Sequence, residues 1–143
     1  MRRTALAVIL LVSLPEVIEA EARAGDEEMA GYAFGKSYTI SVTREALRRA
    51  PAWDESAENP PLSARRALKL ATECQRALVA APADWEWHLM YLGLRQNNGR
   101  WYWLANFEAY PTRHAFDGVA PNLYVAVLMD GTVVKPVIRN KRR

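Results

Sequence analysis

The sequence is poor in the residues that build disulfide frameworks and metal sites. Its 143 residues include one cysteine and two histidines. A single cysteine excludes a small protein held together by internal disulfides, and it excludes a metal site made of several thiolates. Cys74, His88 and His114 also lack the paired spacings that place two ligands on one metal ion. We therefore expect no metal site and no cofactor.

Long apolar runs are lacking as well, because no run reaches the roughly 18–20 residues that a membrane-spanning helix needs. The run at 5–14 follows Arg2 and Arg3 and precedes small residues spaced for signal-peptide cleavage at 20–24. A positive start, a short apolar stretch and a small-x-small site are typical of a secretory signal peptide. We expect residues 1–24 to be such a peptide and the protein to be exported to the periplasm or the extracellular space.

Net charge is low, since 19 basic and 16 acidic side chains leave a formal charge of +3. Much of the excess lies at 139–143, so the rest of the chain is close to neutral. A nucleic-acid-binding protein usually spreads basic residues over one face, and we therefore expect no nucleic-acid partner.

Half of the residues are hydrophobic, which excludes a disordered chain. We expect a flexible lead-in over 25–36, a single domain over 37–138 and a basic tail over 139–143.

The first part of this domain combines a strand with two helices. Polar and apolar residues alternate over 37–43, which predicts a half-buried strand with Tyr38, Ile40 and Val42 facing inward. Thr43 is suited to cap a short helix over 44–50. After a proline-rich loop, apolar residues recur at helical spacing over about 64–81, with Ser63 as the cap.

The second part predicts two hairpins. Asn98-Gly99 favours a two-residue turn between strands 85–97 and 100–110, because both turn positions need positive φ. On one side, this register pairs Leu94 with Trp103, Leu92 with Ala105 and Met90 with Phe107. Asp130-Gly131 predicts a second two-residue turn, between strands 122–129 and 132–138. Pro136 places that last strand at a sheet edge.

The order strand, helix, four-strand meander predicts an α+β domain in which a long helix packs on one antiparallel sheet. This element order resembles the cystatin-like superfold, which includes the PepSY-type propeptide domains and the cystatins. The central inhibitory loop of the cystatins is absent. Two segments, 103–108 and 127–134, also look like small exported bacterial proteins without known activity. The resemblance implies a fold, an exported location and, for PepSY domains, a role in inhibiting or chaperoning a neighbouring protease.

The register also predicts which residues lie on the sheet face that points away from the helix. Tyrosine and arginine carry much of the energy of protein interfaces, and this face is rich in both. We expect a partner, an envelope protein or a peptide, to bind there. The candidate residues are Tyr91, Arg95, Tyr102, Asn106, Glu108 and Tyr124. A second route for a partner is strand addition at the edge of 37–43.

Three functions remain open from the sequence. The leading one is an exported, non-catalytic binding or regulatory module, for which we name no catalytic residue. The second is a small-ligand-binding or isomerase-like enzyme with its ligand between helix and sheet, where Glu108, Tyr91 and Tyr102 would supply the residue types. That enzyme needs a cavity next to an acid, and a filled core would exclude it. The third is a structural envelope protein whose basic tail contacts anionic surfaces.

Overall fold

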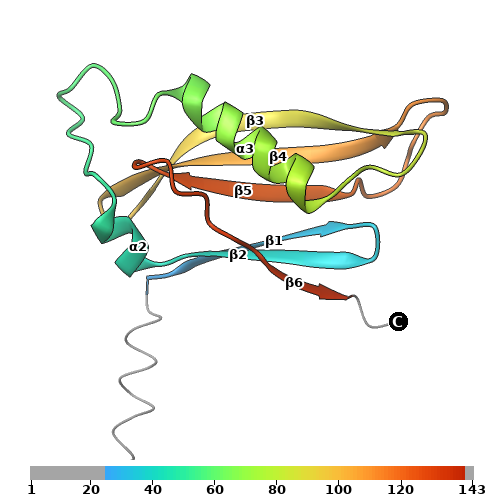
Figure 1. Ribbon diagram of the computed structural model, residues 1–143, viewed down its shortest axis with the longest axis horizontal. Coiled ribbons are helices and arrows are strands. Elements are labelled where there is room, and N and C mark those ends of the chain that lie inside the picture. Colours follow the sequence, from blue (N-terminus) through green and yellow to red (C-terminus); the bar gives the residue numbers. More distant parts are fainter. Residues whose placement is uncertain (1–24, 141–143) are drawn as a thin grey trace, which may run out of the picture.

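A computed structural model describes residues 25–140, and the predicted signal peptide and residues 141–143 lie outside them. Strands account for 44% of the described residues and helices for 18%. Figure 1 shows the element order along the chain. The elements are β1 (Glu27–Ala33), β2 (Lys36–Val42), α2 (Arg44–Arg49), α3 (Ala64–Leu78), β3 (Trp85–Asn97), β4 (Arg100–Pro111), β5 (Asn122–Leu128) and β6 (Val137–Asn140).

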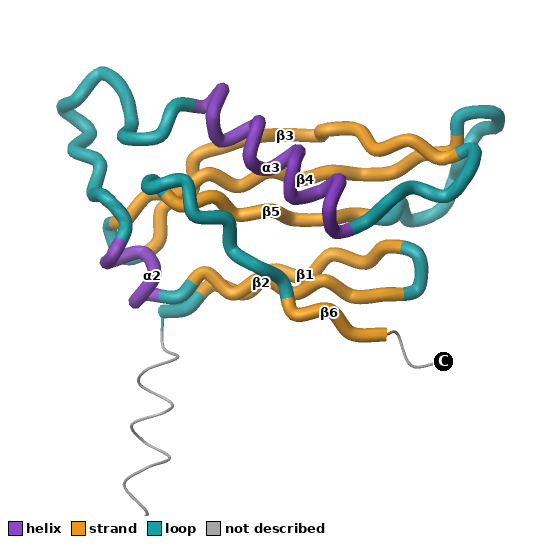
Figure 2. The backbone as a smooth tube through the Cα atoms, in the orientation of Figure 1, coloured by secondary structure: helices purple, strands orange, loops and turns teal. Residues whose placement is uncertain are grey.

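The strands form two antiparallel sheets and not one. The first sheet has the order β1-β2-β6, and the second has the order β3-β4-β5. Figure 2 shows α3 lying across the second sheet, with the first sheet beyond β5. The prediction of a helix packed on one four-strand meander is therefore wrong. The last strand leaves the predicted meander and pairs with β2 instead.

The first sheet begins in a segment that we expected to be a flexible lead-in. Residues 27–33 form β1, which pairs along its whole length with β2. Phe34 and Gly35 connect the two strands with φ of 47° and 82°, the conformation of a type I′ hairpin turn. β2 lies between β1 and β6, and β6 pairs with residues 36–39, so the predicted open edge at 37–43 is covered over its first part. The inward orientation of Tyr38, Ile40 and Val42 is confirmed, since all three are buried.

The β5 turn differs from the predicted one because Asp130 does not adopt positive φ. Among the turn residues, Gly131 does, at 89°. Gly131 N–H donates to the Leu128 carbonyl at 2.9 Å, and Leu128 N–H donates to the Thr132 carbonyl at 2.8 Å. This pattern describes a three-residue loop, 129–131, with glycine in the left-handed position. The extra loop residue shifts the predicted register by one, so Val127 pairs with Val133 in place of Val134.

The predicted β3–β4 hairpin is largely confirmed. Asn98 and Gly99 have φ of 50° and 72°, and Leu94 lies opposite Trp103 as expected. A β-bulge between Leu89 and Tyr91 shifts the register beyond that point, so Phe107 faces Leu89 and not Met90. Met90 is 49% exposed as a result and does not join the core.

Two hydrophobic clusters lie on opposite faces of β4. On one face, Trp103 and Phe107 pack with Ala67 and Ala71 of α3. Small side chains on α3 let the helix approach the sheet closely. On the other face, the second cluster joins side chains of β2, α2, β4 and β5. Its buried members are Ile40, Val42, Leu47, Ala50, Tyr102, Leu104, Ala126 and Leu128.

Candidate functional site

The sheet face that we predicted to be open is covered over much of its area. Tyr102 is fully buried and Asn106 is only 6% exposed, because β2 and α2 pack on this side of β4. These two residues are therefore not available on an open surface. Tyr91, at 44% exposure, remains accessible on the edge strand β3. The alternation identified the correct face of the sheet, but it did not predict that β2 and α2 pack against this face.

Three of the six predicted residues meet at a cleft between the two sheets. Tyr91 and Arg95 come from β3 and Tyr124 from β5, and Leu104 of β4 lies between them in the sheet. Met29 and Ala30 of β1 supply the opposite wall. The cleft has a volume of about 380 Å³. Gly93 lies opposite Leu104 and carries no side chain, which leaves room between Tyr91 and Arg95.

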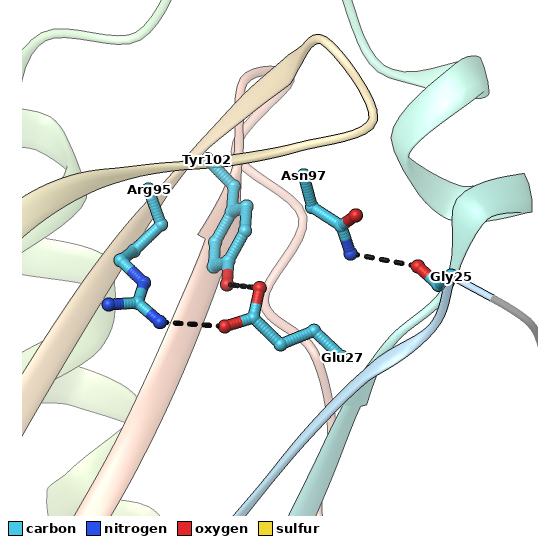
Figure 3. Close-up of polar contacts among 5 residues, drawn as sticks. All are labelled: Gly25, Glu27, Arg95, Asn97 and Tyr102. Atoms are coloured by element: carbon cyan, nitrogen blue, oxygen red, sulfur yellow. Dashed lines mark hydrogen bonds and ion pairs between the residues drawn. The ribbon is translucent and has the colours of Figure 1, made fainter.

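An ion pair beside the cleft, in which the lining residue Arg95 takes part, links the two sheets (Figure 3). Arg95 Nη2 donates to Glu27 Oε1 at 2.8 Å, and the Tyr102 hydroxyl donates to Glu27 Oε2 at 2.7 Å. Asn97 Nδ2 also donates to the Gly25 carbonyl, at 2.9 Å. These contacts attach the start of β1 to the β3–β4 hairpin.

The carboxylate and the phenol of this network have shifted pKa values. Burial raises the pKa of Glu27, but the hydrogen bonds from Arg95 and Tyr102 and the Arg95 charge outweigh it, so the pKa lies below its ordinary value. Burial, together with the neighbouring Glu27 carboxylate, holds the pKa of Tyr102 well above its ordinary value. Glu27 is therefore anionic and Tyr102 neutral at physiological pH.

Asn106 lies next to the cleft, buried beside its lining residues, and has an unsatisfied oxygen. The register places it between Tyr91 and Tyr124, on the same face of the second sheet. Its Oδ1 atom is buried without a hydrogen-bond partner. A buried polar atom left without a partner costs about 1–3 kcal/mol. Burial raises the pKa of Tyr91, with Tyr124 adding to this effect and Arg95 opposing it, so Tyr91 is a neutral phenol beside the amide.

Glu108, the sixth predicted residue, lies away from the cleft. It pairs with His88 and Asn122, further along the second sheet. Its Oε2 accepts a hydrogen bond from the Tyr110 hydroxyl, and the Tyr110 ring contacts His88. Glu108 is therefore outside the cleft lining and lies well along β4 from Tyr102, with which an isomerase-like site would combine it.

Sequence reasoning missed the contribution of β1, which supplies Glu27, Met29 and Ala30. Burial alternates along this strand, since residues 27, 29, 31 and 33 are more buried than their neighbours, but the sequence does not alternate in the same way, because Ala30 and Tyr32 are apolar at outward positions. Two adjacent glutamates and Gly31 further obscured the strand. Gly31 is required by close packing, because a Cβ there would lie 2.6 Å from the Asn122 carbonyl oxygen.

A second pocket, of about 450 Å³, lies between the end of α3 and β3. Gln75, Arg76, Trp87 and Phe107 are among its lining residues, and none of the lining residues is acidic. Cys74, on the same helix, is half-buried, and burial raises the pKa of its thiol. This thiol lacks the depressed pKa of a reactive nucleophile.

The described residues contain no group of histidine, cysteine or acidic side chains arranged to hold a metal ion. No helix within 25–140 is both long and apolar enough to cross a membrane.

Comparisons with family models, with curated proteins and with solved structures find no match to the chain. The resemblance to cystatin-like and PepSY-type domains therefore stays a prediction.

Proposed function

We propose that this protein is a non-catalytic binding module of the cell envelope, and that its inter-sheet cleft receives a side chain from a partner protein or peptide. The observation that carries this proposal is the buried, unpartnered oxygen of Asn106 between the two tyrosines of the cleft. A bound N–H or O–H donor that displaces the side chains covering Asn106 would satisfy that oxygen. The free-energy cost of leaving this oxygen without a partner in the free protein would then be recovered on binding.

The cleft lining limits the chemistry of the occupant. Met29, Ala30 and Leu104 offer apolar surface, and two phenol groups offer polar edges. The positive charge of Arg95 is balanced by Glu27, at 2.8 Å, so the cleft has little net charge. This lining suits a neutral occupant with an apolar body and one hydrogen-bond donor. The side chains of tryptophan, tyrosine and glutamine meet both conditions.

Glu27 is the carboxylate next to the cleft, and its environment argues against catalysis. Both of its oxygens accept hydrogen bonds, and its lowered pKa makes it a weak base at neutral pH. Between helix and sheet, where an isomerase-like enzyme would hold its ligand, Trp103 and Phe107 pack against α3, and the pocket left at the end of α3 has no acidic residue in its lining. The arrangement therefore favours binding over proton transfer.

The test is quantitative affinity capture from envelope extract with three baits: the wild-type protein, Tyr91→Ala and Tyr110→Ala. Tyr110→Ala also removes a tyrosine side chain, but its position on β4 lies outside the cleft lining. We expect one stoichiometric partner on the wild-type and Tyr110→Ala baits, reduced at least about tenfold on Tyr91→Ala. A tenfold loss corresponds to about 1.4 kcal/mol, which is typical of a tyrosine at an interface.

The captured partner should also protect the cleft residues from chemical modification. Tyr91 is accessible in the free protein and would lose reactivity toward tyrosine-specific reagents on binding. Equal capture by all three baits, or unchanged modification of Tyr91 in the complex, would rule out the cleft as the binding site.

A further inference from the structure

The pocket between the end of α3 and β3 lies on the opposite face of the second sheet from the inter-sheet cleft. Phe107, in its lining, belongs to the cluster on the α3 side of β4, whereas Leu104, in the cleft lining, belongs to the other cluster. The volume of the pocket, about 450 Å³, is within the roughly 300–1,000 Å³ that small-molecule sites occupy. The pocket is therefore a separate site with the size of a small-molecule site.

Burial divides the pocket lining into an apolar base and an open rim. Phe107 and Val79 are almost fully buried and lie at the base. Leu89 is 40% exposed, and Arg76, in the last turn of α3, is exposed as well. An occupant can therefore bury an apolar part at the base and keep a charged end at the rim, in contact with water, which avoids the cost of burying a charge.

The rim of the pocket carries a positive charge that no acidic residue balances. Arg76 is the charged residue of the lining, and within residues 25–140 it forms no ion pair. Glu73, one turn earlier on α3, is paired with Lys69. The negative end of the α3 dipole offsets only about half an elementary charge. In the inter-sheet cleft, by contrast, Arg95 is balanced by Glu27 at 2.8 Å.

A second hydrogen-bond donor beside this pocket also lacks a partner. Trp87 lines the pocket from β3, and its Nε1 atom is buried with no hydrogen-bond partner in the described part of the chain. An indole N–H can donate but cannot accept. An acceptor in the pocket that displaces the groups covering this atom would satisfy it. Arg76 and Trp87 are thus both suited to an acceptor, and Arg76 favours one with negative charge.

We propose that this pocket binds a small organic acid, a free monocarboxylate with an apolar body. The Arg76 guanidinium presents a fork of N–H donors that matches the two oxygens of a carboxylate. The apolar body of the acid would cover Phe107, Val79 and Leu89, the apolar surface below the rim. Binding would remove this surface from water, which is favourable in proportion to its area.

The same lining disfavours two other anions. A doubly charged phosphate would leave one negative charge unbalanced, because Arg76 supplies a single positive charge. The carboxylate end of a peptide would bring backbone N–H and C=O groups against the apolar base, where Phe107 and Val79 offer them no hydrogen bonds. A free acid with a hydrocarbon body has neither disadvantage.

This inference goes beyond the proposed function, because it concerns another site on the other face of the sheet. It does not rest on Asn106 or on the inter-sheet cleft. Failure of acid binding would leave partner capture at the cleft unchanged, and failure of partner capture would leave acid binding unchanged.

The first test is isothermal titration calorimetry of the purified full chain at neutral pH. Octanoate and phenylbutyrate are the monocarboxylate probes, octylammonium carries the octanoate chain with the opposite charge, and acetate lacks the apolar body. We expect one molecule of either larger acid per chain, and at least about tenfold weaker binding of octylammonium and acetate. Failure of both larger acids to bind at millimolar concentration would overturn the inference. Equal binding of octanoate and octylammonium would overturn it as well.

Two further probes test the other anions. Octyl phosphate and an apolar tripeptide with a free carboxylate should each bind more weakly than octanoate. Tighter binding of octyl phosphate would assign the pocket to phosphate esters, and tighter binding of the tripeptide would assign it to peptide ends. Either result would overturn the proposal of a free monocarboxylate.

The second test removes the charge at the rim. Arg76→Met keeps an unbranched apolar side chain and should weaken octanoate binding at least about tenfold, without weakening octylammonium binding. Arg66→Met is the matched control, because it makes the same change at an exposed position of α3 outside the lining. It should bind octanoate as the wild type does. Equal octanoate affinity of Arg76→Met and the wild type would overturn the role of Arg76.

The third test places a large side chain in the pocket lining. Ala80 lines the pocket and is exposed, so Ala80→Trp leaves the core unchanged and should abolish octanoate binding. Circular dichroism and thermal unfolding of the unliganded variant should match the wild type. Unchanged octanoate binding by a folded Ala80→Trp protein would place the acid elsewhere and overturn the inference.

Discussion

The two faces of β4 are covered in different ways, although both are buried. On the α3 face the contacts are apolar, and the Trp103 indole also donates to the Leu62 carbonyl at 2.8 Å. On the other face, Tyr102 reaches an ionised carboxylate and Asn106 keeps an unpartnered oxygen. The α3 face therefore contributes stability through packing. The cleft face instead buries polar groups, and the Asn106 oxygen among them has no partner within the described residues.

The largest effect is expected from breaking the apolar face at its centre. Trp103→Ala removes a buried indole and its hydrogen bond, and we expect it to lower the free energy of unfolding by about 3–5 kcal/mol. Urea unfolding followed by circular dichroism measures this loss. Trp101→Ala, at a half-buried neighbouring position, should cost clearly less. Equal losses for the two variants would contradict the assignment of Trp103 to the core.

A smaller effect is expected from removing one hydroxyl on the cleft face. Tyr102→Phe deletes the hydrogen bond to Glu27 and should cost about 1.5–3 kcal/mol at neutral pH, as is usual for bonds to a charged group. The pKa of Glu27 is lowered in the folded protein, so its stabilising contribution is present above the unfolded pKa and is lost as pH falls through the folded pKa.

The difference between the wild type and Tyr102→Phe should therefore shrink in acid. Unfolding midpoints measured from neutral pH down to about pH 3 test this pH dependence. A difference that stays constant over this range would show that the hydroxyl does not act through the Glu27 carboxylate.

The smallest effect is expected to be a gain in stability. Asn106→Leu replaces an amide with an unpartnered oxygen by an apolar side chain of similar size, and we expect the free energy of unfolding to rise by up to about 1 kcal/mol. The same variant should lose partner capture, because the hydrogen-bond acceptor is gone. Thermal unfolding together with the capture assay reads out both effects. A strongly destabilised Asn106→Leu protein would mean that the amide is satisfied in the folded chain.

The sequence predicted local features of the fold well and long-range pairing poorly. Asn98-Gly99 specified its turn because both residues accept positive φ, and the alternation at Tyr38, Ile40 and Val42 identified the buried side of β2. The pairing of β6 with β2 depends on contacts between the two ends of the described chain. No local pattern encodes such a choice, so the single sheet was a reasonable prediction and a wrong one.

The candidate site was predicted in part for the same reason. Alternation along β3 and β4 placed Tyr91, Arg95 and Tyr102 on one face, which is correct. It could not show that β2 and α2 would cover Tyr102, or that Glu27 would meet Arg95. Those contacts join segments that are far apart in the sequence, and β1 itself was hidden by polar residues and Gly31.

The position of β6 has a consequence for how the chain folds. β2 is synthesised well before its second neighbour in the sheet, β6, which lies far along the chain. Until then, the β1–β2 ribbon has an open side that can pair with other nascent chains. Such non-local pairing slows folding and lengthens exposure to aggregation. The pairing of β6 with β2 is thus the step that commits the first sheet to its native form.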